Sequence, residues 1–304
     1  MNMLNKIKTI RCNNNLVYVV LKQDMEIQQF YEVFYISKNR QKLFNINADA
    51  ILYANKTYTI TTRRKNEHIQ TSPHDIEIVY EDDICLIVNK PTNLLIHDDG
   101  ASPDTLCSRV NFYTLCNNYK FFAYPIHRID KETSGLVFFV KHPFFHSFFD
   151  HQIQEHIIKK QYLGVVQGTF PYRHKHIEKP ISRDRHDAKK MIVSNKGKTA
   201  ITDIYKVTTK DHYSLLSIGI KTGRKHQIRT HLKYIGYPIV NDPLYGYILD
   251  NRKLLLESYA IDFYHPLENR FIHIQAPIDP RFKPFSHIDL TSTIKMPLHK
   301  THQK

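Results

Sequence analysis

The sequence predicts an α+β fold with a mixed, largely antiparallel sheet and a smaller N-terminal domain. Strands dominate from residue 76 onward, where short apolar runs alternate with polar turns. Residues 1–72 differ in character, because they are rich in Asn, Lys, Tyr and Ile and contain neither glycine nor proline. We therefore expect an N-terminal domain over 1–72, a larger domain over 73–291 and a flexible basic tail over 292–304.

The N-terminal domain shows its own strand and helix patterns. Leu16–Leu21 is a strand candidate, and residues 28–36 place Phe30, Val33 and Phe34 on one face of a helix. Ser37 could cap a second helix. Residues 51–60 could form a hairpin around Asn55-Lys56. Residues 71–74 are the best linker, because Pro73 disfavours helix before it.

The larger domain begins with a predicted hairpin. Strands at 76–80 and 84–88 flank the acidic turn Glu81–Asp83. Residues 182–198 are polar and read as an exposed excursion. Apolar periodicity predicts helices at 106–119 and 144–158, and strands at 136–140, 201–207, 213–220, 259–263 and 271–274.

The charge of the chain favours a nucleic-acid partner. Of its 304 residues, 43 are Lys or Arg and 29 are Asp or Glu, so the formal net charge is +14. Residues 221–233 contain Lys221, Arg224, Lys225, Arg229 and Lys233 without an acidic residue. Such a strip attracts a phosphate backbone.

Several classes of protein are not indicated. No uncharged apolar run approaches the roughly 18 residues that a membrane helix needs, and residues 1–11 lack a signal-type apolar segment. We expect a cytoplasmic protein that does not enter a membrane. The four cysteines form no CxxC pair, and residues 151–156 do not match a zinc-protease motif. We expect no metal, and we see no carboxylate cluster typical of a nuclease.

The most informative stretch runs from His127 to Val140. It places Arg128 two residues before Asp130, then a Thr-Ser-Gly turn, then a buried strand. Thr133 and Ser134 could donate hydrogen bonds to the carboxylate. A lone aspartate here would usually be only a turn residue.

Four segments together resemble the RluA-like pseudouridine synthases. Residues 127–130, HRID, resemble the family's HRLD, with Ile129 for Leu. Residues 89–91 match NKP, and 160–168 resemble KxYxAxVxG, with Gly164 for Ala. Residues 222–231 match TGRxHQIRxH, and Gly236, Pro238-Ile239, Asp242 and Tyr245-Gly246 follow in register. The resemblance covers roughly residues 76 to 290.

The resemblance implies a catalytic domain of pseudouridine synthase type, with an isomerase activity that needs no cofactor. It also implies that an S4-like RNA-binding module can precede this domain, although residues 1–72 could be an unrelated basic extension. The expected partner is RNA, first that of the large ribosomal subunit and second transfer RNA. We expect a monomer. The rival interpretation is a non-catalytic RNA-binding or ribosome-assembly factor on the same scaffold.

The resemblance also assigns catalytic roles. Asp130 would be the reacting carboxylate, Arg229 would pair with it and keep it ionised, and Tyr162 would stack on the uracil. The alternatives are a phosphate clamp for Arg229 and a core tyrosine for Tyr162.

RNA-binding roles follow from the flipping of the target base. Because a stacked uridine cannot reach a buried aspartate, it must leave the stack, and Arg128 would fill the vacated place. Lys90, Arg224 and Lys225 would contact phosphates. The alternatives are a structural ion pair for Arg128 and simple solvation for the other three.

Overall fold

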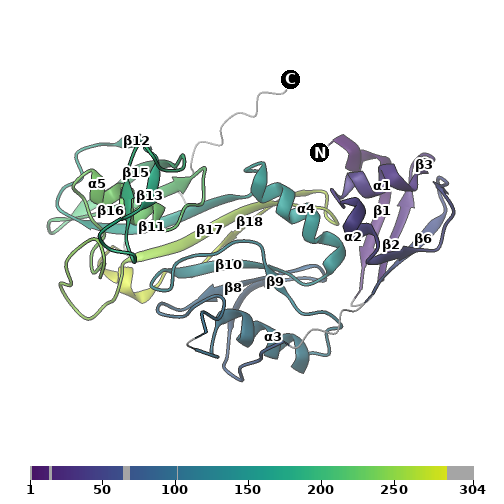
Figure 1. Cartoon of the computed structure of the whole chain (residues 1–304), viewed down its shortest axis with the longest axis horizontal. Helices are drawn as coiled ribbons and strands as arrows, with labels where there is room; N and C mark the ends of the chain where they lie inside the picture. Colours follow the sequence, from purple (N-terminus) through teal and green to yellow (C-terminus); the bar gives the residue numbers. More distant parts are fainter. Residues whose placement is uncertain (1, 14–15, 64–68, 101, 286–304) are drawn as a thin grey trace. The chain divides into compact units, whose positions relative to one another are not determined.

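The computed structural model describes residues 2–13, 16–63, 69–100 and 102–285 (Figure 1). The predicted tail at 292–304 lies outside these residues. The chain divides into two compact units. Unit 1 comprises Met1–Lys131, Gly135–Lys159 and Ile261–Gln275, and unit 2 comprises Glu132–Ser134, Lys160–Ala260 and Ala276–Lys304. The division does not fall at residue 72, so an independent N-terminal domain stays a prediction.

The N-terminal part of unit 1 is a small α/β module. Its main sheet has the order β1-β2-β6-β4, and β3 pairs with β5. The predicted first strand and first helix are present. After the 3-10 helix η1 (Asn2–Lys6), the elements are β1 (Ile7–Cys12), β2 (Leu16–Leu21), β3 (Met25–Glu26), α1 (Ile27–Val33), α2 (Lys38–Gln41), β4 (Phe44–Ile46), β5 (Ile51–Leu52) and β6 (Thr57–Thr62).

The predicted hairpin at 51–60 is wrong. A turn does occur there, with Asn55 at φ +59°, but the two strands that it joins take different partners. Leu52 of β5 pairs with Met25, whereas Tyr58 and Ile60 of β6 pair with β2. The alternating burial of β6 places these two side chains in the core on β2, and this packing overrides the local turn signal.

Aromatic rings join this module to helix α4 (Pro143–Gln154) within unit 1. The ring centroids of Phe34 and Phe144 lie 4.8 Å apart, and Phe30 stacks on Phe144 at 6.1 Å. Arg40 of α2 also contacts His146 of α4 at 3.2 Å. The aromatic face of α4 is therefore core packing.

The rest of unit 1 is a sheet with a helix on each face of β10. The predicted hairpin forms from β7 and β8, and β10 pairs with β8. Val137 and Phe139 pack with α3, whereas Phe138 points to the opposite face and contacts Phe149 of α4. The elements are β7 (Glu77–Glu81), β8 (Cys85–Lys90), α3 (Leu106–Cys116), β9 (Tyr124–Pro125), β10 (Ser134–Val140) and β18 (Arg270–Gln275).

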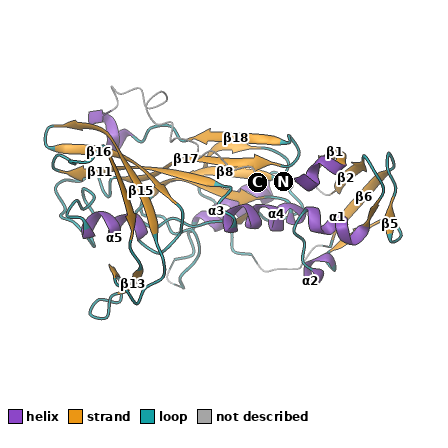
Figure 2. Cartoon of the chain, turned by 90° about the horizontal axis from the view of Figure 1, so that it is seen from above, coloured by secondary structure: helices purple, strands orange, loops and turns teal. Residues whose placement is uncertain are grey.

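Unit 2 is also mainly antiparallel sheet, with strand order β12-β15-β16-β11. Strands β15, β16 and β11 are labelled in Figure 2. Helix α5 packs on β14 and β15. The elements are β11 (Lys159–Gln167), β12 (His174–Glu178), β13 (Ile181–Arg183), β14 (Met191–Val193), β15 (Ile201–Lys210), β16 (Tyr213–Ile220), α5 (Gln227–Tyr234), β17 (Leu256–His265) and the 3-10 helix η2 (Pro280–Phe285). Strand β17 begins in unit 2 and ends in unit 1.

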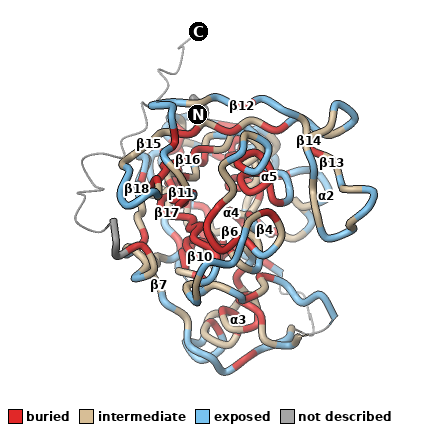
Figure 3. Tube along the Cα trace, turned by 90° about the vertical axis from the view of Figure 1, so that its left-hand side faces the viewer, coloured by how far each residue is buried: buried red, intermediate tan, exposed pale blue. Residues whose placement is uncertain are grey.

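Burial follows the predicted pattern. Every residue of β10 is buried, whereas the segment around β13 and β14 is largely exposed (Figure 3). The predicted excursion at 182–198 is therefore confirmed, although it contains two short strands. The antiparallel sheets with few helices confirm the α+β class. Among the described residues, no helix has the length and apolar character needed to cross a bilayer.

Candidate active site

Arg229 is the best-defined charged group of the candidate site. It lies on the buried face of α5, and its side chain has no exposed surface. Its Nε and Nη2 each donate to a carboxylate oxygen of Asp242 at 2.8 Å, and its Nη1 donates to Glu132 at 3.1 Å. Arg229 is therefore a fixed positive charge gripped by two carboxylates of unit 2.

The loop before α5 is organised by Gln227. Its side-chain oxygen accepts hydrogen bonds from the hydroxyl of Thr222 at 2.7 Å and from the amide of Arg224 at 3.1 Å. Its side-chain nitrogen donates to the carbonyl of Ile201 at 2.9 Å. These bonds tie the TGRKHQ segment to β15, which explains why a glutamine stands at this place in the motif.

The turn at 241–246 contacts Arg229 through the side chains of Asp242 and Tyr245. Besides the arginine, Asp242 accepts from the amides of Leu244 and Tyr245 at 2.9 and 3.1 Å. The ring of Tyr245 lies 5.4 Å from the guanidinium carbon. Burial raises the pKa of Tyr245, so its hydroxyl stays protonated, and it bonds His226 Nδ1 at 2.9 Å.

Tyr162 lies in the middle of β11, opposite Ile218 of β16. Its side chain is 5% exposed. The structure thus places two of the three predicted catalytic residues, Tyr162 and Arg229, in unit 2.

Asp130 follows His127 and Arg128 in a segment without regular structure in unit 1. The ring of His127 is buried and its Nε2 accepts the amide hydrogen of Phe138 at 3.2 Å, which gives this histidine a structural role. Asp130 is half-buried and Arg128 is exposed. The pairing of Asp130 with Arg229 stays a prediction.

Lys90 requires a correction. We expected a phosphate contact, but the side chain has no exposed surface. Its ammonium donates to the carbonyls of Pro91 and Leu94 at 2.9 Å and of Lys131 at 3.0 Å. An ammonium has three N–H donors, so Lys90 ties backbone segments together and is not presented to RNA. Arg224 and Lys225 are exposed, as phosphate contacts must be.

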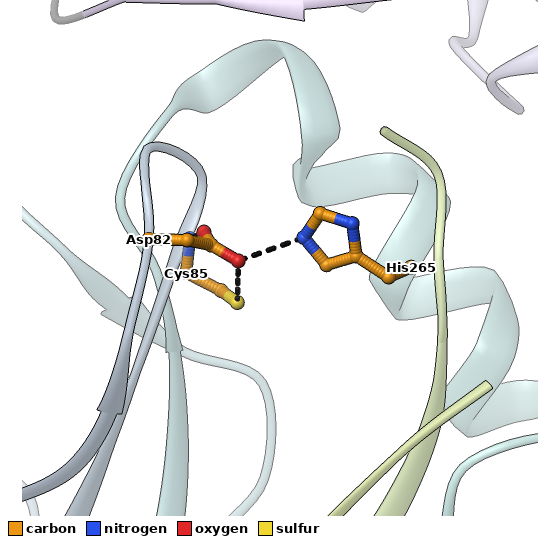
Figure 4. Close-up of side chains that lie close together, drawn as sticks. All are labelled: Asp82, Cys85 and His265. Atoms are coloured by element: carbon orange, nitrogen blue, oxygen red, sulfur yellow. Dashed lines mark hydrogen bonds and ion pairs between the residues drawn. The ribbon is translucent and has the colours of Figure 1, made fainter. Parts of the chain in front are cut away.

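A second polar cluster lies in unit 1, where Asp82, Cys85 and His265 come together (Figure 4). Asp82 accepts from His265 Nε2 at 2.8 Å and from the hydroxyl of Tyr80 at 2.7 Å. His265 Nδ1 accepts the amide hydrogen of Glu268 at 3.1 Å, so Nε2 carries the proton that it gives to Asp82. Burial raises the pKa of the Cys85 thiol. This is the pattern of a hydrogen-bonded tie between two turns, because a metal would need a thiolate and an unprotonated Nε2.

Sequence reasoning missed the carboxylates that hold Arg229. Asp242 and Tyr245 were noted as motif positions without a role, and Glu132 was not singled out. The available signal was the acidic residue two places after Asp130. The role of Glu132 depends on Arg229 of α5, which lies 97 residues further along the chain.

Comparison with known proteins agrees with the motifs. The family described as "RNA pseudouridylate synthase" matches residues 84–234. The chain is 32% identical to "Uncharacterized RNA pseudouridine synthase YlyB" of Bacillus subtilis, over 69% of this chain and 71% of that protein. It is 36% identical to "Ribosomal large subunit pseudouridine synthase C" of Buchnera aphidicola, over 68% of each chain.

Among solved structures, "Human RNA Pseudouridylate Synthase Domain Containing 1" has the same fold. Its TM-score is 0.58 at 22% identity, over 69% of this chain and 85% of the human chain. The sequence relatives, the matched family and the order of the four motifs agree. The chain therefore belongs to the RluA-like family of RNA pseudouridine synthases, and its activity is the isomerisation of uridine in RNA.

Proposed function

We propose that the chain modifies specific uridines of large-subunit ribosomal RNA, as a monomer in the cytoplasm. Support comes from relatives in Buchnera aphidicola, Borreliella burgdorferi and Zymomonas mobilis, which carry the name ribosomal large subunit pseudouridine synthase C or D. Transfer RNA is the alternative substrate. A non-catalytic factor would be expected to lack Asp130, Tyr162 or Arg229, and the chain has all three.

In the proposed reaction, the carboxylate of Asp130 assists cleavage of the glycosidic C–N bond as nucleophile or charge stabiliser. The uracil rotates and rejoins the ribose through C5, and a general base removes the C5 proton. Tyr162 stacks on the uracil and assists that deprotonation. No electron is gained or lost, so the reaction requires no redox cofactor.

The observation that carries this assignment is the bond between Arg229 and Glu132. Glu132 stands two residues after Asp130, so covalent geometry keeps their Cα atoms within about 7 Å of each other. Arg229 therefore holds the side chain of a residue that stands two places after the proposed catalytic aspartate. Three of the five guanidinium N–H groups serve Asp242 and Glu132.

RNA binding is assigned to three exposed cations. Arg128 stands two residues before Asp130 and takes the place of the flipped uridine. Arg224 and Lys225 contact phosphates. The Nε of Arg224 donates to the carbonyl of Thr199 at 2.9 Å, which fixes the direction of its side chain.

The experiment is a map of pseudouridines in total RNA from cells with the chain, without it, and with Asp130→Asn. Sites in ribosomal RNA that vanish in both defective strains support the proposal. Asp98→Asn is the matched control, because Asp98 is an exposed acid of the same unit. Sites only in transfer RNA would overturn the substrate assignment, and normal modification by Asp130→Asn would overturn the catalytic one.

A further inference from the structure

Three consecutive large apolar residues are exposed in unit 2, close in the chain to the turn that supports Arg229. Tyr247 is 73% exposed, Ile248 63% and Leu249 42%. The first two are the most exposed large hydrophobic residues in the described part of the chain. Single exposed apolar residues are normal, but a run of three in a folded protein usually serves a binding function. We call these residues the apolar tip.

The apolar tip is held rigidly at its base. The side-chain oxygen of Asn241 accepts from the amides of Leu249 at 2.7 Å and Asp250 at 3.2 Å, and its nitrogen donates to the Asp250 carboxylate at 2.7 Å. Arg252 closes the network by donating to Asp250 from two nitrogens. A tip that is already ordered loses little conformational entropy when it binds a partner.

The same turn connects the apolar tip to Arg229. Asn241, which anchors the tip, is followed directly by Asp242, which grips the arginine. At Gly246 the chain passes so close to the carbonyl oxygen of Ile239 that an added Cβ would lie 2.8 Å from it. The turn at 241–246, which contacts Arg229 through Asp242, thus also fixes the direction in which the apolar tip extends.

The charged residues beside the apolar tip indicate which kind of molecule binds to it. Lys253 follows the tip as an exposed cation, and Asp250, the acid next to the tip, is already bonded to Arg252. A protein surface of alternating charge would find few acidic partners here, whereas RNA offers a phosphate for Lys253 and base faces for the apolar groups. An aromatic ring stacks on any base, because every base has a π-face.

We propose that the apolar tip positions the substrate by stacking Tyr247 on an unpaired base that flanks the target uridine, with Ile248 packed against the same base. The inference rests on the RNA pseudouridine synthase activity of the family. It adds a positioning surface that acts through the neighbouring nucleotide and not through the reacting uracil.

The test uses an RNA fragment that contains a mapped target uridine. Tyr247→Ala should lower kcat/KM by about tenfold, within the range that one stacked base contributes, mainly by raising KM. Tyr247→Phe should restore it, because stacking does not need the hydroxyl. Phe271→Ala is the control, because Phe271 is 55% exposed but lies on β18, outside the loop that carries the apolar tip.

Abasic substitutions in the RNA make the test specific. If Tyr247 stacks on one flanking base, removal of that base should abolish the difference between wild type and Tyr247→Ala, while removal of other bases should leave it. If the loss of kcat/KM caused by Tyr247→Ala is the same on every abasic RNA as on the intact RNA, the proposal is wrong. Asp130→Asn separates this result from the catalytic assignment, because it should stop turnover while the affinity difference caused by Tyr247→Ala remains.

Two other occupants give distinct outcomes. A second copy of the chain would make wild type dimeric in sedimentation and Tyr247→Ala monomeric, with kcat/KM on the fragment unchanged. A protein partner would likewise leave kcat/KM on the isolated fragment unchanged. Either result would overturn the proposal.

Discussion

Lys90 in unit 1 and Arg229 in unit 2 are both cations without exposed surface, but their partners differ in kind. Lys90 donates to the backbone carbonyls given above, whereas Arg229 donates to the carboxylates of Asp242 and Glu132. They also hold consecutive residues, since Lys90 bonds the carbonyl of Lys131 and Arg229 the side chain of Glu132. The turn that follows Asp130 is thus fixed once in each unit.

The contrast extends to two carboxylates. Asp242 of unit 2 is held by a guanidinium, whereas Asp82 of unit 1 is held by a tyrosine hydroxyl, a histidine ring and amides. The unit 1 groups are therefore structural ties, whereas Arg229 forms a buried ion cluster with its two carboxylates in unit 2.

The largest expected effect comes from dividing the Arg229–Asp242 pair. Arg229→Met leaves a carboxylate buried without its counter-ion and should cost about 3–5 kcal/mol of the free energy of unfolding. Asp242→Asn strands the guanidinium and should cost a similar amount. The double variant should be more stable than the sum of the two losses predicts, and it should remain inactive because the positive charge is gone.

Urea denaturation of the four proteins gives the coupling energy. Additive losses in the double variant would mean that the two side chains stabilise unit 2 independently, which contradicts the ion-pair interpretation. Recovered activity in the double variant would show that the charge of Arg229 is not needed for the reaction.

A smaller effect is expected for Lys90. Lys90→Met has similar volume but removes the donor for three backbone carbonyls, of which the contact with Leu94 is buried and the other two are partly buried, so it should cost about 3 kcal/mol of the free energy of unfolding. Because Lys90 does not reach RNA, the slope of log K against log salt should not change. Lys225→Ala is the matched comparison and should reduce that slope by about 0.7 to 0.9. If Lys90→Met reduced the salt slope as much as Lys225→Ala, Lys90 would contact phosphate after all.

The sequence predicted local structure well where burial follows a simple period. Residues 136–140 are an uninterrupted apolar run and form the buried strand β10, and the acidic turn at 81–83 joins two paired strands. The four motifs identified the family. These features are encoded by neighbouring residues, so no knowledge of the tertiary fold was needed.

Features that depend on distant partners were missed. Lys90 precedes a proline at a strand end, which resembles an exposed position, and one of its acceptors lies 41 residues away. Helix α5 starts without a side-chain cap, because His226 at its start has φ +53°, so the usual start signal is absent. The role of Glu132 depends on that helix.

The smallest of the three effects concerns Asp82, and it depends on pH. Burial opposes ionisation of this carboxyl group, but the hydrogen bonds from His265, Tyr80 and the amide of Ile84 outweigh it and lower the pKa of Asp82 to about 2. The folded pKa lies below the ordinary value of 3.8, so ionised Asp82 stabilises the fold above pH 4. That stabilisation, about 2 kcal/mol, is lost as the pH falls from 4 toward 2.

Asp82→Asn should therefore lower the free energy of unfolding at neutral pH and flatten its fall between pH 4 and 2. Asp83→Asn is the control, because Asp83 is an exposed acid of the same turn and its loss should leave the profile unchanged. Urea denaturation at a series of pH values measures both. An Asp82→Asn profile as steep as that of wild type would show that the groups bonded to this carboxylate do not favour its charged form, and the contrast with Asp242 would then fail.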